Sequence, residues 1–307
     1  MNASRGLTQD EIARGLREIG LKAGDVALVH SAMRTLGPVD GGPERVVKAF
    51  LDILGDKGTL VAPTFTFKHE ATENPLIDLL NDRSEMGVIS EAVRTWPGAR
   101  RSLAYRHSFA AIGRRAEVIT DVDPSLSVFD VRSSFGVMLA LDARVVLLGV
   151  TYASSTSHHF AEALCDVPYR RYIRRNVRVR LADGSIVEQV MLDYQPKPGP
   201  DGSYYGLRHA DFNRLGGMLE DKGRVRIAAI GNAVVRHFAM RDLIDLAQVE
   251  AEKDFDVFRS VEGATEYSPL AFGVSVMSPL IPDAAGRPQR YQWCVVDPRK
   301  LSMPKAQ

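Results

Sequence analysis

The chain has 307 residues, of which 45% are hydrophobic and 25% charged, and its formal net charge is +1. This composition is typical of a soluble α/β protein, and the near-zero charge gives no reason to expect nucleic acid or a membrane surface as a partner. No apolar run approaches the ~18 residues of a membrane span, and no signal peptide is expected at the first residues. Cys165 and Cys294 lie far apart without metal-ligand spacing, which favours a reducing, cytoplasmic setting.

The first part of the chain predicts a strand, a helix and a second strand. A capping box begins an amphipathic helix over residues 8–19. Residues 26–30 are an apolar run that predicts a buried strand. A helix over residues 43–54 and a strand over residues 59–67 follow, and Pro63 predicts that this strand bends or ends. Strand, helix and strand in this order predict a parallel pair.

The next part alternates polar connections with short elements. Residues 68–86 are polar and loop-like, with a short helical turn expected around residues 76–80. A helix is expected at residues 88–93, a strand at residues 109–113, and a short helix that follows residues 133–136 and runs through Leu141.

A buried strand at residues 145–150 leads into a hydroxyl-rich turn and then a helix, with Thr156 or Ser157 as its N-cap. Ligands in α/β proteins collect beyond the carboxyl ends of strands and at helix N-termini. Thr156, His159 and Glu162 stand three residues apart at this junction. Because positions i and i+3 share a helix face, the His159 ring and the Glu162 carboxylate are expected to meet.

The remaining chain predicts an antiparallel insertion and further α/β elements. A β-hairpin is expected over about 170–195, and a loop rich in proline and glycine over residues 195–206. A helix at 211–220, a strand at 225–230 and a helix at 239–250 follow.

Five short motifs stand in a fixed order along residues 8–250. They are His30-Ser31-Ala32-Met33-Arg34-Thr35-Leu36-Gly37 before Gly41-Gly42, residues 58–65, Arg101-Ser102 before His107-Ser108 and Gly113, Ser134-Phe135-Gly136, and Leu147-Leu148-Gly149-Val150 before Thr156-x-x-His159-x-x-Glu162. Together they resemble the aminoglycoside 3-N-acetyltransferase family of coenzyme A-dependent acyltransferases.

The resemblance implies an α/β/α layered fold with a mixed sheet and the hairpin as an insertion. It implies an acyltransferase domain at residues 1–258, with residues 259–307 as an irregular extension packed on the same domain. It further implies acetyl-CoA as cosubstrate, a primary amine of a small molecule as acceptor (an aminoglycoside or another natural-product amine), and a cytoplasmic homodimer.

The family's site residues carry over to matching positions of this chain. His159, Glu162 and Thr156 correspond to the family's catalytic set. The implied coenzyme contacts are Ser31, Ala32, Met33, Arg34, Thr35, Leu36, Gly37, Ser102, Ser134, Phe135 and Gly136.

The catalytic set has the chemistry that amide formation needs. An ammonium ion cannot attack a thioester, so the amine must lose a proton, and histidine is the usual base near neutral pH. Glu162 would fix the ring tautomer of His159, and the Thr156 hydroxyl would donate to the oxyanion of the tetrahedral intermediate. Neither cysteine pairs with a histidine in the sequence, so no acyl-enzyme is expected.

Two features depart from the family or bear on the acceptor. Ala104 and Tyr105 stand where the family often has His-Pro. Six arginines lie within residues 170–180, and if this hairpin flanks the acceptor site it favours an uncharged or anionic amine. A solvated face or a dimer surface is the other interpretation of the arginines. His107 is open to a structural or a functional interpretation.

Two other functions are compatible with parts of the pattern. The Ala104-Tyr105 departure suggests a coenzyme A-binding relative that has lost catalysis. A metal hydrolase would use His158, His159 and Glu162, but adjacent residues on a helix point about 100° apart and chelate poorly together. No metal is therefore expected, and His158 is expected to be structural.

Overall fold

The computed structural model describes residues 5–70, 72–181, 183–198 and 210–259. The strands of its main sheet are β1 (Val26–Ser31), β2 (Thr59–Pro63), β4 (Arg100–Arg101), β5 (Phe109–Gly113), β6 (Arg144–Leu148), β9 (Arg226–Ile230) and β10 (Ala233–Ala239). They form one seven-stranded sheet in the order β4-β5-β2-β1-β6-β10-β9.

The centre of this sheet is parallel and its flanks are antiparallel. β1 pairs in parallel with β2 and β6, which confirms the expected parallel pair. β5 and β10 run antiparallel to their neighbours β2 and β6. The carboxyl ends of β1, β2 and β6 therefore share one edge of the sheet with the amino ends of β5 and β10. Ligands of α/β proteins bind at such an edge.

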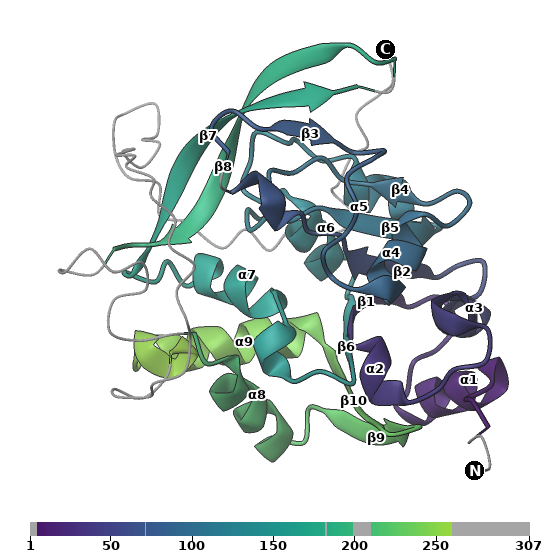
Figure 1. Cartoon of the computed structure of the whole chain (residues 1–307). Helices are drawn as coiled ribbons and strands as arrows, with labels where there is room; N and C mark the ends of the chain where they lie inside the picture. Colours follow the sequence, from purple (N-terminus) through teal and green to yellow (C-terminus); the bar gives the residue numbers. More distant parts are fainter. Residues whose placement is uncertain (1–4, 71, 182, 199–209, 260–307) are drawn as a thin grey trace.

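Helices cover both faces of the sheet (Figure 1). They are α1 (Gln9–Glu18), α2 (Met33–Leu36), α3 (Gly42–Leu54), α4 (Val88–Arg94), α5 (Ala116–Thr120), α6 (Ser134–Ala140), α7 (Ser157–Leu164), α8 (Phe212–Asp221) and α9 (Met240–Ala251). Side chains of α1, α3 and α4 pack with Val146 and Leu148 on one face, and those of α5 to α9 pack with Val145 and Leu147 on the other. Alternate residues of a buried strand thus supply two cores, and the expected α/β/α layering is confirmed.

A second sheet stands beside the first. It contains β3 (Leu76–Asp78), β7 (Arg170–Arg180) and β8 (Ile186–Pro196), in the order β3-β7-β8. β7 and β8 form the expected long antiparallel hairpin, seen as the twisted pair of strands in Figure 1. A small core of Ile77, Val177, Val179, Met191 and Tyr105 holds this sheet together.

One local expectation was wrong. Residues 76–80 contain a strand instead of a helical turn, because β3 pairs in parallel with the distant Arg178–Arg180 segment of β7 and buries Ile77 there. The strand expected over residues 59–67 ends at Pro63, where the sequence allowed a bend or an end. Three short 3-10 turns complete the described elements, at η1 (Phe67–His69), η2 (Tyr152–Ser154) and η3 (Phe255–Phe258).

β10 was missed from the sequence, although a signal for it exists. Gly231 and Asn232 form a two-residue connection between Ile230 and Ala233, which pair directly. Gly231 has a φ of 58°, in the left-handed region that tight hairpin turns need.

Part of the sequence analysis concerns residues outside the described ranges. The proposed extension at residues 259–307 lies outside them except for Arg259, and so does most of the loop at residues 195–206. Among the described helices, none combines the length and the apolar character needed to cross a membrane.

Candidate active site

The candidate site begins where β6 ends at the sheet edge. Leu148 is fully buried, and its carbonyl accepts a hydrogen bond from the Ala32 amide at 3.0 Å. Gly149 follows with a φ of 70°, and a Cβ atom there would lie 1.8 Å from Thr35 Oγ1. Only glycine fits this position. The close approach brings residues 31–37 against the turn that precedes α7.

α7 begins at Ser157 with Thr156 as its N-cap, as expected. The Thr156 side chain does not cap the helix, however, because the residue already has helical angles (φ −68°, ψ −11°). Its hydroxyl oxygen is buried and has no hydrogen-bond partner among the described residues. A buried hydroxyl without a partner is costly, so this group is available to a ligand.

His159 and Glu162 meet one turn apart on α7, as the i and i+3 spacing predicts. His159 Nδ1 lies 2.5 Å from Glu162 Oε2. The Glu162 side chain is completely buried, whereas 24% of the His159 side chain is exposed. Because an ionised carboxylate only accepts hydrogen bonds, Nδ1 carries the ring proton and Nε2 is the acceptor. Nε2 has no hydrogen bond to any described residue.

Tyr169 and Arg170, which follow α7, also contact the Glu162 carboxylate. Arg170 Nη2 lies 2.9 Å from Glu162 Oε2, and the Tyr169 hydroxyl donates to Oε1 at 3.2 Å. Burial alone raises the pKa of Glu162, but Arg170 and His159 together lower it below its ordinary value. Glu162 is therefore ionised at neutral pH. The sequence analysis missed Tyr169 as a site residue and did not connect Arg170 with Glu162.

The His159 ring is neutral at neutral pH. Burial, and after it the charge of Arg170, lower the pKa of His159 below its ordinary value, and Glu162 offsets this only in part. The sequence analysis did not bring Arg170 to this ring, since Arg170 is eleven residues away in the chain. Rings of Phe212 and Phe129 lie edge-on to His159, at centroid distances of 4.7 and 5.9 Å.

His158 lies in the core, and its ring has Phe212 as a neighbour in common with His159. It is fully buried and stacks on Phe212 at 4.9 Å, and burial lowers its pKa to about 3. This position agrees with a structural role. Among the described residues, no three His, Cys, Asp or Glu side chains are grouped so that they could hold a metal ion.

Residues 31–37 form a short, fixed connection rather than an open loop. The Thr35 hydroxyl donates to the Ala32 carbonyl at 2.7 Å, and the Leu36 carbonyl accepts from the Asn232 amide at 3.2 Å. Leu36 is buried in the core, whereas the Arg34 side chain is exposed to solvent. Arg34 is thus the accessible cation of this segment.

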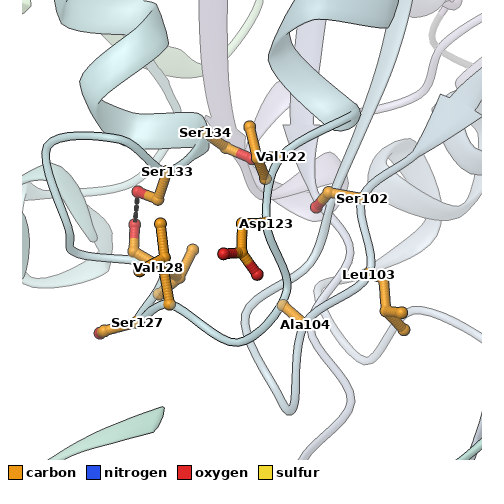
Figure 2. A pocket seen from close by; sticks show the side chains of 10 residues that line it. Ser102, Leu103, Ala104, Val122, Asp123, Ser127, Val128, Ser133 and Ser134 are labelled. Carbon is orange, nitrogen blue, oxygen red and sulfur yellow. Dashed lines mark hydrogen bonds between the residues drawn. The ribbon is translucent and has the colours of Figure 1, made fainter. Parts of the chain in front are cut away.

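The other coenzyme candidates divide into pocket and core residues. Ser102 and Ser134 line a small pocket together with Asp123, shown in Figure 2. Phe135 and Gly136 lie in the core instead, where Phe135 stacks on Phe160 at 5.2 Å. Ser102 Oγ also accepts from the Phe109 amide at 2.9 Å, so it fixes the end of β5.

Gly136 is required by close packing. A Cβ atom there would lie 1.7 Å from the Val131 carbonyl oxygen, a backbone atom. We expect Gly136→Ala to lower the free energy of unfolding by about 1–3 kcal/mol, measured by denaturant unfolding. Gly217→Ala is the matched control, since a Cβ in that helix meets nothing within 4 Å, and it is expected to stabilise the protein by about 0.5–1 kcal/mol. Equal effects of the two substitutions would contradict this account.

Among the described residues, three of the six arginines of the hairpin are paired with carboxylates. Arg170 pairs with Glu162, Arg175 with Asp193 at 3.3 Å, and Arg180 with Asp78 at 3.1 Å. The positive charge of the hairpin is therefore partly neutralised.

Ala104 and Tyr105, which depart from the family pattern, lie at the pocket and under the hairpin. Ala104 lines the pocket of Figure 2. Tyr105 is buried under the hairpin, where the Arg175 guanidinium lies 5.5 Å from its ring centroid. His107 packs against Phe65 at 4.7 Å, and burial lowers its pKa well below the ordinary value.

Comparison with known proteins connects this geometry to a family. The family model for aminoglycoside 3-N-acetyltransferase matches residues 28–250. Aminoglycoside N(3)-acetyltransferase VII of Streptomyces paromomycinus is 31% identical over 261 residues, which cover 78% of this chain and 89% of the relative.

Solved structures agree with this match. The crystal structure of aminoglycoside acetyltransferase AAC(3)-Xa matches with a TM-score of 0.71 and 26% identity, over 81% of this chain and 93% of that one. A mutant of aminoglycoside acetyltransferase AAC(3)-IVa in complex with a gentamicin matches with a TM-score of 0.65 and 26% identity, over 84% and 93% of the two chains.

Proposed function

The chain belongs to the aminoglycoside 3-N-acetyltransferase family of acyltransferases, and we propose that it transfers the acetyl group of acetyl-CoA to a primary amine of an aminoglycoside. His159 is the proposed general base and Glu162 orients it. The observation that carries this proposal is the 2.5 Å contact between Nδ1 and Glu162, which leaves Nε2 of a neutral ring as an acceptor.

The proposed reaction is direct attack. The amine nitrogen forms a bond to the thioester carbonyl carbon, while His159 Nε2 removes a proton from the nitrogen and the carbonyl electrons move onto oxygen. Collapse of this intermediate breaks the carbon–sulfur bond, and the imidazolium returns the proton to the leaving thiolate. Glu162 stabilises the imidazolium in the interval. The products are the amide and free coenzyme A.

An acyl-enzyme on Cys165 is not part of this scheme. Burial raises the pKa of the Cys165 thiol to about 12, so the thiolate needed for attack is scarce at neutral pH. Cys294 lies outside the described residues.

Thr156 is the proposed oxyanion donor. Its hydroxyl is buried and has no hydrogen-bond partner among the described residues. Thr156 is the N-cap of α7, three residues before His159. One donor of this kind is typically worth about 10²–10³-fold in rate.

The coenzyme is proposed to lie along the sheet edge that these segments share. Ser102 and Ser134 offer hydroxyl groups in the pocket of Figure 2, and Arg34 offers an exposed cation for the phosphates. Phe135 and Gly136 would act indirectly, by fixing the helix that carries Ser134.

The test is an acetyl-transfer assay with a panel of aminoglycosides and of amines with few charges. We expect free thiol to be released from acetyl-CoA with at least one aminoglycoside, and mass spectrometry to find one added acetyl group on it. Coenzyme A binding by calorimetry without turnover on any amine would instead identify a relative that binds the coenzyme and does not catalyse.

A further inference from the structure

Tyr169 and Arg170 together enclose the Glu162 carboxylate. Three groups surround its two oxygens: the Tyr169 hydroxyl at Oε1, and Arg170 Nη2 and His159 Nδ1 at Oε2. We propose that Arg170 is a positioning residue of the transfer reaction, which orients Glu162 and adds to burial in keeping the His159 ring unprotonated, and so extends activity to lower pH. This inference rests on the proposed function of His159.

The contact geometry gives Arg170 both roles. Its Nη2 atom lies 2.9 Å from Glu162 Oε2 and 3.0 Å from His159 Nδ1. Since Nδ1 already carries a proton for Glu162, Nη2 cannot donate to Nδ1, and the second contact places a cation beside the ring. Only 9% of the Arg170 side chain is exposed, so water screens this charge weakly.

The side chain of Arg170 has few other anchors. Its guanidinium lies 5.5 Å from the centroid of the Tyr194 ring, and its Nε atom has no hydrogen-bond partner among the described residues. Its position therefore depends on Glu162 and on Tyr194. A substitution of either Arg170 or Glu162 is therefore expected to disturb the position of the other.

Other charged and titratable groups face His159 from each packed element. Glu162 and His158 belong to α7, and His107 and Arg106 belong to the connection before β5. Tyr169 belongs to the turn before β7, and Tyr194 belongs to β8. Arg106 also lowers the pKa of His159, but less than Arg170 does, and Arg106 is paired with Glu70 and with Asp193 at 2.9 Å. Arg170 is thus the cation in direct contact with the ring.

The sign of the effect follows from these charges. With Arg170 removed, Glu162 remains beside the ring and favours the imidazolium, so the pKa of His159 rises. The neutral base is then lost at a higher pH than in the wild type, and it is regained as the pH increases further. At a pH below the new midpoint, the rate falls about tenfold for each unit by which the pKa of the base has risen.

The experiment compares pH profiles of kcat/KM for the wild type, Arg170→Gln and Arg170→Lys. For Arg170→Gln we expect the acidic limb to move to higher pH and the lost activity to return on the alkaline side. Arg170→Lys keeps the charge but loses the planar fork, so we expect the limb near its wild-type position with a lower kcat. Arg174→Gln, an exposed position on the same strand, is the control with an unchanged profile.

The outcomes separate this inference from the proposed function. An Arg170→Gln profile whose limb stays in place, with a rate loss equal at all pH values, contradicts the role of Arg170. Activity that survives removal of His159 contradicts the proposed function instead. If thermal melting finds that Arg170→Gln does not fold, Arg170→Lys carries the test, and a wild-type kcat in that variant overturns the positioning role.

Discussion

Replacement of His159 by alanine is expected to lower kcat for acetyl transfer by about 10²–10⁴-fold, the usual contribution of a positioned base. The ring supplies the only proposed proton acceptor for the attacking amine, and Nε2 is free to accept because Glu162 holds Nδ1. Coenzyme A affinity, measured by calorimetry, is expected to stay near the wild-type value. The rate is measured by thiol release at saturating amine.

Two comparisons make this result specific. Imidazole added to His159→Ala is expected to restore part of the rate, since it can enter the space left by the ring. His237→Gln is the matched control, because His237 is also a mostly buried histidine and burial lowers its pKa to about 4. A His159→Ala enzyme as active as the His237→Gln enzyme would remove His159 from the mechanism.

Glu162→Gln is expected to lower kcat by roughly 10³–10⁴-fold, the size found when the orienting carboxylate of a histidine base becomes an amide. A glutamine amide that faces Nδ1 can donate its own proton and hold the ring as the Nε2–H tautomer. The nitrogen that must accept a proton then carries one. The shape of the site is nearly unchanged, so the loss reports on the tautomer.

Controls for Glu162→Gln address charge and stability. Glu117→Gln removes an exposed carboxylate that pairs with Arg100 at 3.4 Å, and its kcat is expected to be unchanged. Because the pKa of Glu162 is lowered in the folded protein, its ionised form stabilises the fold at neutral pH, and this contribution is lost as the pH falls through that pKa. Glu162→Gln should therefore depend less on pH in acid unfolding. A wild-type kcat in this variant would contradict the orienting role.

Local sequence patterns were sufficient for much of the fold. The apolar runs predicted β1, β6 and the parallel pairing of β1 with β2, since a buried parallel strand is apolar on both faces. β3 could not be predicted in this way, because it is a strand only through pairing with β7 about 100 residues later. β10 was predictable in principle from the Gly231-Asn232 connection, which marks a hairpin.

The candidate site was predictable where its geometry is local. The i and i+3 spacing brings His159 to Glu162 on one helix, and this needs no knowledge of the rest of the chain. Tyr169 and Arg170 reach Glu162 only because the chain turns back after α7, where Asp166 has a φ of 49°. A surface interpretation was natural for Arg170, since arginine is seldom buried unless it is paired.

The most direct test of the central claim is nitrogen NMR of the His159 ring in the wild-type protein, assigned by comparison with His159→Ala. The account predicts a neutral ring at neutral pH with its proton on Nδ1, and a titration midpoint that coincides with the acidic limb of kcat/KM. A charged ring at neutral pH, or a proton on Nε2, would contradict the claim that Glu162 prepares His159 to accept the proton of the amine.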